Sequence, residues 1–265
     1  MAINGKWHFC LYLVWNAFHY VLSIACGVII WKVKEPKTSK IKFEVKIIKK
    51  LLGKKRYWNA YFFSLCSHLP KNIVTMMFAL FLLTKTGFIF EETSGLALLL
   101  NWNFFGLVLF VQLIAAGGVV ISSFIIGKLM ERANGKKLFV ITTVLSIILG
   151  IFINVFTQDL ISGYIVVFLL GFSSGATDTI AMTYSARITQ ENPASTSTHF
   201  SIFTSFMNAG ATIGLAIFSA ALPVFISIMP TTVEAYGLVF IISPLTGALA
   251  LFFLKGLPKN RKTTG

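Results

Sequence analysis

Hydrophobic residues occur along this chain in long runs that short polar segments separate. A helix needs about 20 mainly apolar residues to cross the hydrocarbon core of a bilayer. Seven runs are long enough, and they predict transmembrane helices near Phe9–Trp31, Trp58–Leu83, Gly95–Ile126, Leu138–Phe156, Ile161–Ala186, Phe200–Ile228 and Ala235–Leu254. The third run is too long for one upright helix, so it must tilt, bend near Gly117-Gly118 or begin outside the membrane. The pattern predicts an all-α, polytopic membrane helix bundle of about seven transmembrane helices.

The composition agrees with a membrane environment. Of the 265 residues, 56% are hydrophobic and only 12% are charged, whereas soluble domains carry about 25% charged residues. A soluble core of this size cannot bury so much apolar surface, but a bilayer solvates it. The lipid bilayer is therefore the first partner that the sequence predicts.

Basic residues gather in alternate loops. The segment Lys32–Arg56 holds 11 of the 23 Lys and Arg residues, Lys128–Lys137 holds four, Arg187 follows, and the tail from Lys255 holds four more. Because Lys and Arg are enriched in cytoplasmic loops, we expect a multi-pass protein of the cell membrane with a cytoplasmic C-terminus. The net charge of +14 then reflects contact with anionic lipid, and a nucleic-acid partner is not predicted.

This pattern divides the chain into four predicted regions. They are a lone transmembrane helix at 1–31, a basic cytoplasmic linker at 32–56, a six-helix bundle at 57–257 and a cytoplasmic tail at 258–265. Within the linker, Ile41–Leu52 has apolar residues at helical spacing between lysines, which favours an amphipathic helix on the inner leaflet, although its first residues also permit a strand. One helix before a linker and six after it suggest half of a transporter built from two six-helix halves.

The loop after the third span carries a motif, Gly127-Lys-Leu-Met-Glu-Arg-Ala-Asn-Gly-Lys-Lys137. It resembles the signature loop of the major facilitator superfamily, although Glu131 stands where Asp is usual and one extra residue precedes the second Gly. On physical grounds, we expect Gly127 to let two helices approach closely, Glu131 to accept from a helix N-terminus and Arg132 to bridge to a neighbouring helix. With Lys136 these residues form the predicted gating loop. The alternative is a solvated loop that only sets orientation.

The resemblance implies a twelve-helix, two-bundle transporter that works by alternating access, of which this chain is the C-terminal half. The segments Phe81–Phe88, Glu91–Gly95 and Ala181–Asn208 also look like the muropeptide-permease and acetyl-coenzyme A transporter branch of that superfamily. Such a half requires a partner, which is either a missing N-terminal bundle or a second copy of the chain.

Lys71 and Asp178 are charged residues deep inside predicted spans. Ions at membrane depth face a cavity or another helix. Our hypothesis is that the two share the central cavity as a pair that substrate or a proton can break, and the alternative is a static structural ion pair. His68, Lys71 and Asn72 share one helix face, and Pro70 among them predicts a kink. His68 is a candidate proton relay or, equally, a hydrogen-bond partner for another helix.

Other polar residues in the spans are weaker candidates for the substrate or ion pathway, because each can equally join two helices. They are Asn101, Thr177, Tyr184 and Asn208. Gly171 and Gly175 form a G-x-x-x-G, which predicts helix packing rather than a site.

The sequence predicts neither an enzyme nor a metal or cofactor site. It has no nucleotide-binding loop, no H-E-x-x-H and no G-x-S-x-G. The three cysteines, Cys10, Cys26 and Cys66, lie in apolar stretches and are expected to be small buried hydrophobes.

From the spans, the charge pattern and the resemblance together, we predict a secondary active transporter of a small-molecule substrate, coupled to an ion or a proton and present as a C-terminal half or fragment. The alternatives are an intact half-size protein that homodimerises and a non-transporting membrane receptor or scaffold.

Overall fold

The computed structural model describes residues 45–86, 102–191 and 195–258. Within them the regular elements are all helical. The described residues 45–86, 107–191 and 195–258 belong to one compact unit, and of a second unit only residues 102–106, at the start of one helix, are described. The first predicted span, Phe9–Trp31, therefore lies outside the described residues.

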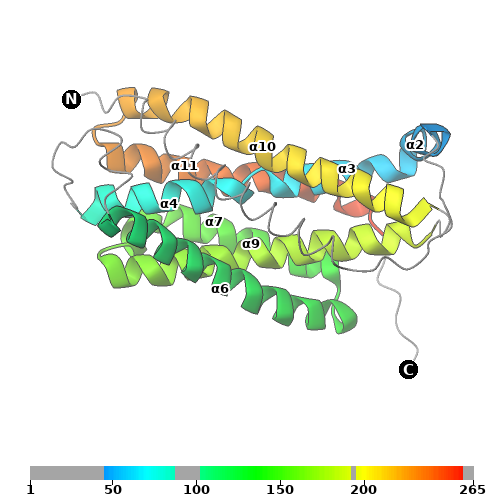
Figure 1. Cartoon of the computed structure of the whole chain (residues 1–265), viewed down its shortest axis with the longest axis horizontal. Coiled ribbons are helices and arrows are strands. Elements are labelled where there is room, and N and C mark those ends of the chain that lie inside the picture. The colour runs from blue at the N-terminus through cyan, green and yellow to red at the C-terminus, as the bar shows by residue number, and fades with distance from the viewer. Residues whose placement is uncertain (1–44, 87–101, 192–194, 259–265) are drawn as a thin grey trace. The chain divides into compact units, whose positions relative to one another are not determined.

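Figure 1 shows the long helices of this unit running side by side along one direction, with the short α2 at one end. In chain order they are α2 (Val45–Leu52), α3 (Lys55–His68), α4 (Lys71–Thr86), α6 (Trp102–Arg132), α7 (Gly135–Ile151), α8 (Ile153–Phe156), α9 (Leu160–Thr189), α10 (Thr196–Ile228), α11 (Thr232–Ala248) and the short 3-10 helix η2 (Leu249–Gly256). Among the described residues, five stretches are long and apolar enough to cross a membrane: Tyr57–Lys85, Val108–Arg132, Leu160–Thr189, Thr196–Ile228 and Thr232–Gly256. The predicted class, an all-helical membrane bundle, is confirmed.

The fourth predicted span, Leu138–Phe156, is divided between two helices. Helix α7 has 17 residues and stops at Ile151, and the four residues of α8 follow after Phe152. From Trp102 onward, the third predicted span lies in α6, which has 31 residues and continues through Gly117-Gly118. At 1.5 Å per residue α6 is roughly 46 Å long, so it is longer than the hydrocarbon core is thick.

A break in the second predicted span separates α3 from α4. Helix α3 ends at His68, the N–H of Leu69 turns back to the carbonyl of Cys66 at 3.3 Å, and α4 starts at Lys71. Pro70 lies in the break, and its missing N–H and fixed ring prevent a continuous helix. The predicted kink is therefore confirmed.

Helices α6 and α9 pack through glycines. A Cβ on Gly171 would collide with the backbone of Ala115, and one on Gly175 would collide with the backbone of Val119. Only hydrogen fits where two backbones approach so closely. The predicted packing role of this G-x-x-x-G is therefore confirmed.

The basic linker ends in a helix that is anchored to the bundle. In α2 the side chain of Leu51 is buried and that of Lys49 is exposed. The indole N–H of Trp58 donates to the carbonyl of Leu52 at 2.8 Å and so ties α3 to the end of α2. The helical prediction is confirmed over Val45–Leu52, and the strand alternative is wrong there.

Two apolar clusters fill the bundle on either side of a polar layer. On α9, one cluster contains Val166, Val167 and Leu170, and the other contains Ala176, Ile180 and Ala181. On the α3–α4 segment, the cluster of Val166 also contains Ile73, which follows Lys71. The cluster of Ala176 contains Leu69, which precedes Lys71. Between the clusters, Ser174 on α9 and Pro70 and Lys71 on this segment line the pocket described below.

Candidate functional site

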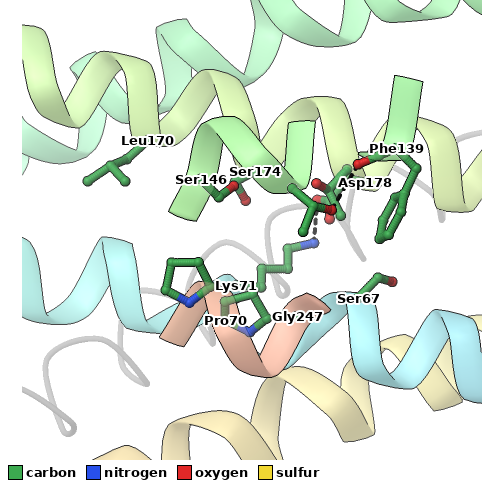
Figure 2. A pocket seen from close by; sticks show the side chains of 12 residues that line it. Ser67, Pro70, Lys71, Phe139, Ser146, Leu170, Ser174, Asp178 and Gly247 are labelled. Carbon is green, nitrogen blue, oxygen red and sulfur yellow. Dashed lines mark hydrogen bonds and ion pairs between the residues drawn. The ribbon is translucent and has the colours of Figure 1, made fainter. Parts of the chain in front are cut away.

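A small pocket lies in this polar layer, inside the bundle. Its volume is about 50 Å³, which is room for a few water molecules but too small for most organic solutes. The lining residues come from α3, α7, α9, α11, the α3–α4 break and the start of α4: Ser67, Pro70, Lys71, Phe139, Thr143, Ser146, Leu170, Ser174, Thr177, Asp178, Pro244 and Gly247 (Figure 2). Residues from five different helices therefore meet at one point inside the bundle.

Lys71 and Asp178 form an ion pair in this pocket. The Nζ atom of Lys71 lies 2.6 Å from Oδ2 of Asp178, and the two side chains are 38% and 24% exposed. Figure 2 shows the lysine extending toward the carboxylate on the facing helix. Lys71 is the first residue of α4, where the positive end of the helix dipole disfavours a cation. The carboxylate offsets that cost and the cost of burying the ammonium.

His68 is a third member of this cluster. Its side chain is 1% exposed, and its Nε2 lies 3.0 Å from Oδ1 of Asp178. Its other ring nitrogen, Nδ1, lies 2.9 Å from the carbonyl oxygen of Ser64 and 3.0 Å from the hydroxyl of Ser67. One carboxylate is therefore held between an ammonium and an imidazole. The sequence placed His68 and Lys71 on one face, but it did not show that both reach Asp178.

Hydroxyl side chains are also among the residues that line the pocket. Thr143 and Ser146 come from α7, and Ser174 and Thr177 come from α9. Ser146 also contacts the hydroxyl of Ser173, which brings α7 and α9 together. Sequence reasoning did not choose Thr143 and Ser146, although two hydroxyls at i, i+3 in an apolar run share one helix face and offered a signal.

The other predicted pathway residues do not all reach this pocket. Thr177 lines it, and Asn72 is half-buried beside Lys71 in the chain. Tyr184 is fully buried in an apolar cluster, with its ring edge-on to Phe63. Asn208 is exposed on α10 and Asn101 lies outside the described residues. Tyr184 and Asn208 are therefore not brought together with His68, Lys71 and Asp178 in this structure.

The predicted gating loop differs from expectation at its first glycine. Among the described residues, nothing lies within 4 Å of a Cβ placed on Gly127, so the expectation that it permits a close helix approach was wrong. The crowded glycine is Gly135, where a Cβ would meet the side chains of Met130 and Tyr184. Gly135 starts α7, so the close approach occurs after the turn of the loop instead of before it.

Different side chains carry the polar roles that we assigned to Glu131 and Arg132, both of which are exposed. Asn134 caps α7 by accepting from the N–H of Lys136 at 3.0 Å, a role expected of Glu131. The bridge expected of Arg132 is made by Arg187, whose guanidinium donates to the carbonyl of Met130 at 3.0 Å. The ammonium of Lys136 also reaches the carbonyl of Lys255, at 3.4 Å. The loop is therefore joined to α9 and η2.

Comparison with known protein families gives a match. The family model of the Major Facilitator Superfamily matches residues 7–198, which is more than half of the chain and includes His68, Lys71 and Asp178. Among curated proteins, none matches the chain. The match does not distinguish between branches of this superfamily, so the likeness to the muropeptide-permease and acetyl-coenzyme A transporter branch stays a prediction. This membrane protein belongs to the major facilitator superfamily of transporters.

Proposed function

We propose that this protein is a secondary active transporter that moves a small solute by alternating access, with protons coupled to the movement at His68, Asp178 and Lys71. One observation supports the coupling above others: the carboxylate of Asp178 is shared by Lys71 at 2.6 Å and His68 at 3.0 Å within a pocket at membrane depth. Ionisable groups in such positions mark ion and substrate pathways. A proton that arrives or leaves changes which of these contacts is favourable.

The helix break supplies a way to move these contacts separately. His68 is the last residue of α3 and Lys71 is the first of α4, so Leu69 and Pro70 lie between the two partners of Asp178. Bending at a helix break is a common way to absorb a domain movement. A change in the angle between α3 and α4 would lengthen one contact while the other is kept.

We propose as the second bundle one of the two partners predicted above, an N-terminal bundle or a second copy of the chain. We propose that the C-terminus is cytoplasmic, because 20 of the 23 basic residues lie in the loops on that side. The four-region division and the two alternative functions, a homodimerising half-size protein and a receptor or scaffold, stay predictions.

Proteoliposomes that contain the full chain and a luminal pH dye would test coupling. A panel of sugars, peptides, nucleosides and organic acids is added outside, and both solute uptake and luminal acidification are measured. The matched variants are Asp178→Asn in the pocket and Asp159→Asn at the exposed start of α9, where Asn caps as well as Asp. We expect at least one solute to enter with protons in the wild type and in Asp159→Asn but not in Asp178→Asn. Uptake without proton movement would refute coupling, and no uptake of any solute would favour the receptor.

A further inference from the structure

His199 is a buried titratable residue that the proposed transport cycle does not use. It is the fourth residue of α10, at the end of the bundle where α10 also meets α2 and α3 (Figure 1). His199 is 0% exposed, and neither Nδ1 nor Nε2 has a hydrogen-bond partner among the described residues. Because the ring has no accessible surface, no space for a water molecule adjoins it. Both nitrogens are therefore buried without the partners that such groups normally have.

Aromatic rings surround this imidazole. Tyr57 and Tyr61 come from α3, with ring centroids 4.5 Å and 5.9 Å from that of His199. Phe203 comes from the next turn of α10, with its centroid 5.1 Å away. These three residues belong to one apolar cluster with Leu51 of α2. The imidazole therefore lies at the junction that joins α2, α3 and α10.

The charge near the ring is positive. Lys54 acts on His199 electrostatically, and its ammonium lies over the ring of Tyr57, 5.4 Å from the centroid. Within the described part of the chain, no carboxylate forms an ion pair with His199. The titratable side chains that contact the ring or act on it are thus Lys54, Tyr57 and Tyr61. None of them supplies a negative charge at neutral pH.

A proton on His199 is unfavourable while this junction is closed. An imidazolium has two N–H donors, and a buried charge without hydrogen bonds is strongly disfavoured. The ring faces of Tyr57 and Phe203 attract a cation, but they do not replace two hydrogen-bond acceptors, and Lys54 repels a second positive charge. His199 is therefore neutral in the closed junction, and it binds a proton when the junction opens to water.

This end of the bundle is close to water. Helix α10 has 33 residues, so at 1.5 Å per residue it is roughly 50 Å long, whereas the hydrocarbon core is about 30 Å thick. The first turn of α10, which contains His199, can therefore extend beyond the hydrocarbon. Lys54 and Lys55, next to the junction at the start of α3, are exposed. They belong to the basic linker, on the side that we propose to be cytoplasmic.

We propose that His199 is a sensor of cytoplasmic acid, and that its protonation favours a state in which α2 and the start of α10 separate from α3. This inference goes beyond the transport function and rests only on the proposed cytoplasmic position of this end. A hydrated imidazole binds a proton near pH 6.5, so the closed junction is most stable above that pH and loses stability as the pH falls below it. Because the opened state alone binds this proton, the ratio of opened to closed junctions should rise roughly tenfold between pH 7.5 and pH 5.5.

Amide hydrogen exchange of the full chain in nanodiscs of zwitterionic lipid tests the sensor. Exchange of residues 45–61 and 196–203 is measured at both pH values and corrected for the chemical dependence of exchange on pH. In the wild type the opening constant of these segments should rise about tenfold at the lower pH, and in His199→Phe this rise should disappear. Tyr61→Phe is the matched control, because the hydroxyl of Tyr61 is also buried without a partner but does not titrate in this range. It should keep the rise. An acid response of equal size in the wild type and in His199→Phe would overturn the proposal.

Thermal unfolding in detergent separates a sensor from a structural histidine. At pH 7.5, His199→Phe should unfold at the same temperature as the wild type or higher, because an apolar ring replaces two polar atoms without partners. The advantage of the variant should grow as the pH is lowered to 5.5. His199→Leu, a smaller side chain, covers the case in which Phe is too large for the site. A lower unfolding temperature of both variants at pH 7.5 would show that the nitrogens have partners and would overturn the proposal. Neither measurement needs a solute, so its outcome is independent of the transport assay.

Discussion

His68 and Lys71 contact opposite oxygens of the same carboxylate from opposite sides of a helix break. The imidazole comes from the end of α3 and the ammonium from the start of α4, with Asp178 on α9 between them. A continuous helix would move both groups together. The break at Pro70 therefore makes the two contacts separable, and this separability is the physical basis of the coupling that we propose.

Removal of the shared carboxylate should harm both transport and stability. In Asp178→Asn, we expect solute-driven proton movement to fall at least 100-fold, because no ionised partner remains for Lys71 and His68. We expect a loss of roughly 1–3 kcal/mol of stability, since Lys71 is partly exposed and the unpaired charge is partly solvated. The measurements are proteoliposome assays and thermal unfolding in detergent.

A double variant separates these two effects. Lys71→Gln with Asp178→Asn removes the ion pair as a unit, so it should recover much of the lost stability while transport stays absent. If Asp178→Asn transports as well as the wild type, the ion pair is only structural, and if the double variant is as unstable as Asp178→Asn, the unpaired ammonium is not the cause.

Restoration of the helix at Pro70 should slow the conformational change. Pro70→Ala supplies an N–H and removes the ring that prevents a continuous helix. We expect the maximum transport rate to fall while the binding constant for solute changes little, because the polar side chains of the pocket are kept. Transport rate and equilibrium binding should be measured on the same preparation. Unchanged turnover would show that bending between α3 and α4 is not part of the cycle.

Two glycines of similar sequence context should respond in opposite ways to alanine. In Gly171→Ala the new methyl group would overlap the backbone of Ala115, so we expect strong destabilisation and poor expression. In Gly127→Ala nothing described lies within 4 Å, so the gain in helix propensity of up to about 1 kcal/mol should make the change neutral or stabilising. Thermal unfolding of both variants decides this. A severe effect of Gly127→Ala would point to a partner at the loop.

The cap of α9 predicts a pH dependence outside the membrane. The backbone N–H of Ser162 and then its hydroxyl hold the pKa of Asp159 below its ordinary value of 3.8. A lowered folded-state pKa stabilises the fold above the ordinary value, and this contribution is lost as the pH falls through the folded-state pKa. Asp159→Ala should therefore be less stable than the wild type at pH 7, with the difference shrinking below about pH 3.8. A difference that is constant with pH would mean that the ionised cap contributes nothing.

Several features of the site were predictable because they depend on local chemistry. The cost of a charge in hydrocarbon marked Lys71 and Asp178 without any structure, and the missing N–H of Pro70 marked the break. The choice of Asn208 and Tyr184 rested on polarity alone. The structure places Asn208 on an exposed face of α10 and Tyr184 in an apolar cluster.

The sequence by itself determined that the chain crosses the membrane, which loops carry the positive charge, where the second span bends and which ions lie deep inside. Only the tertiary structure decided that His68 reaches Asp178, that the hydroxyls of α7 complete the pocket and that Gly135 instead of Gly127 is the crowded glycine. The reason is that lipid and protein core are equally apolar. Hydrophobic periodicity therefore does not reveal how a transmembrane helix is rotated about its axis, and only contacts with neighbouring helices settle which face is buried.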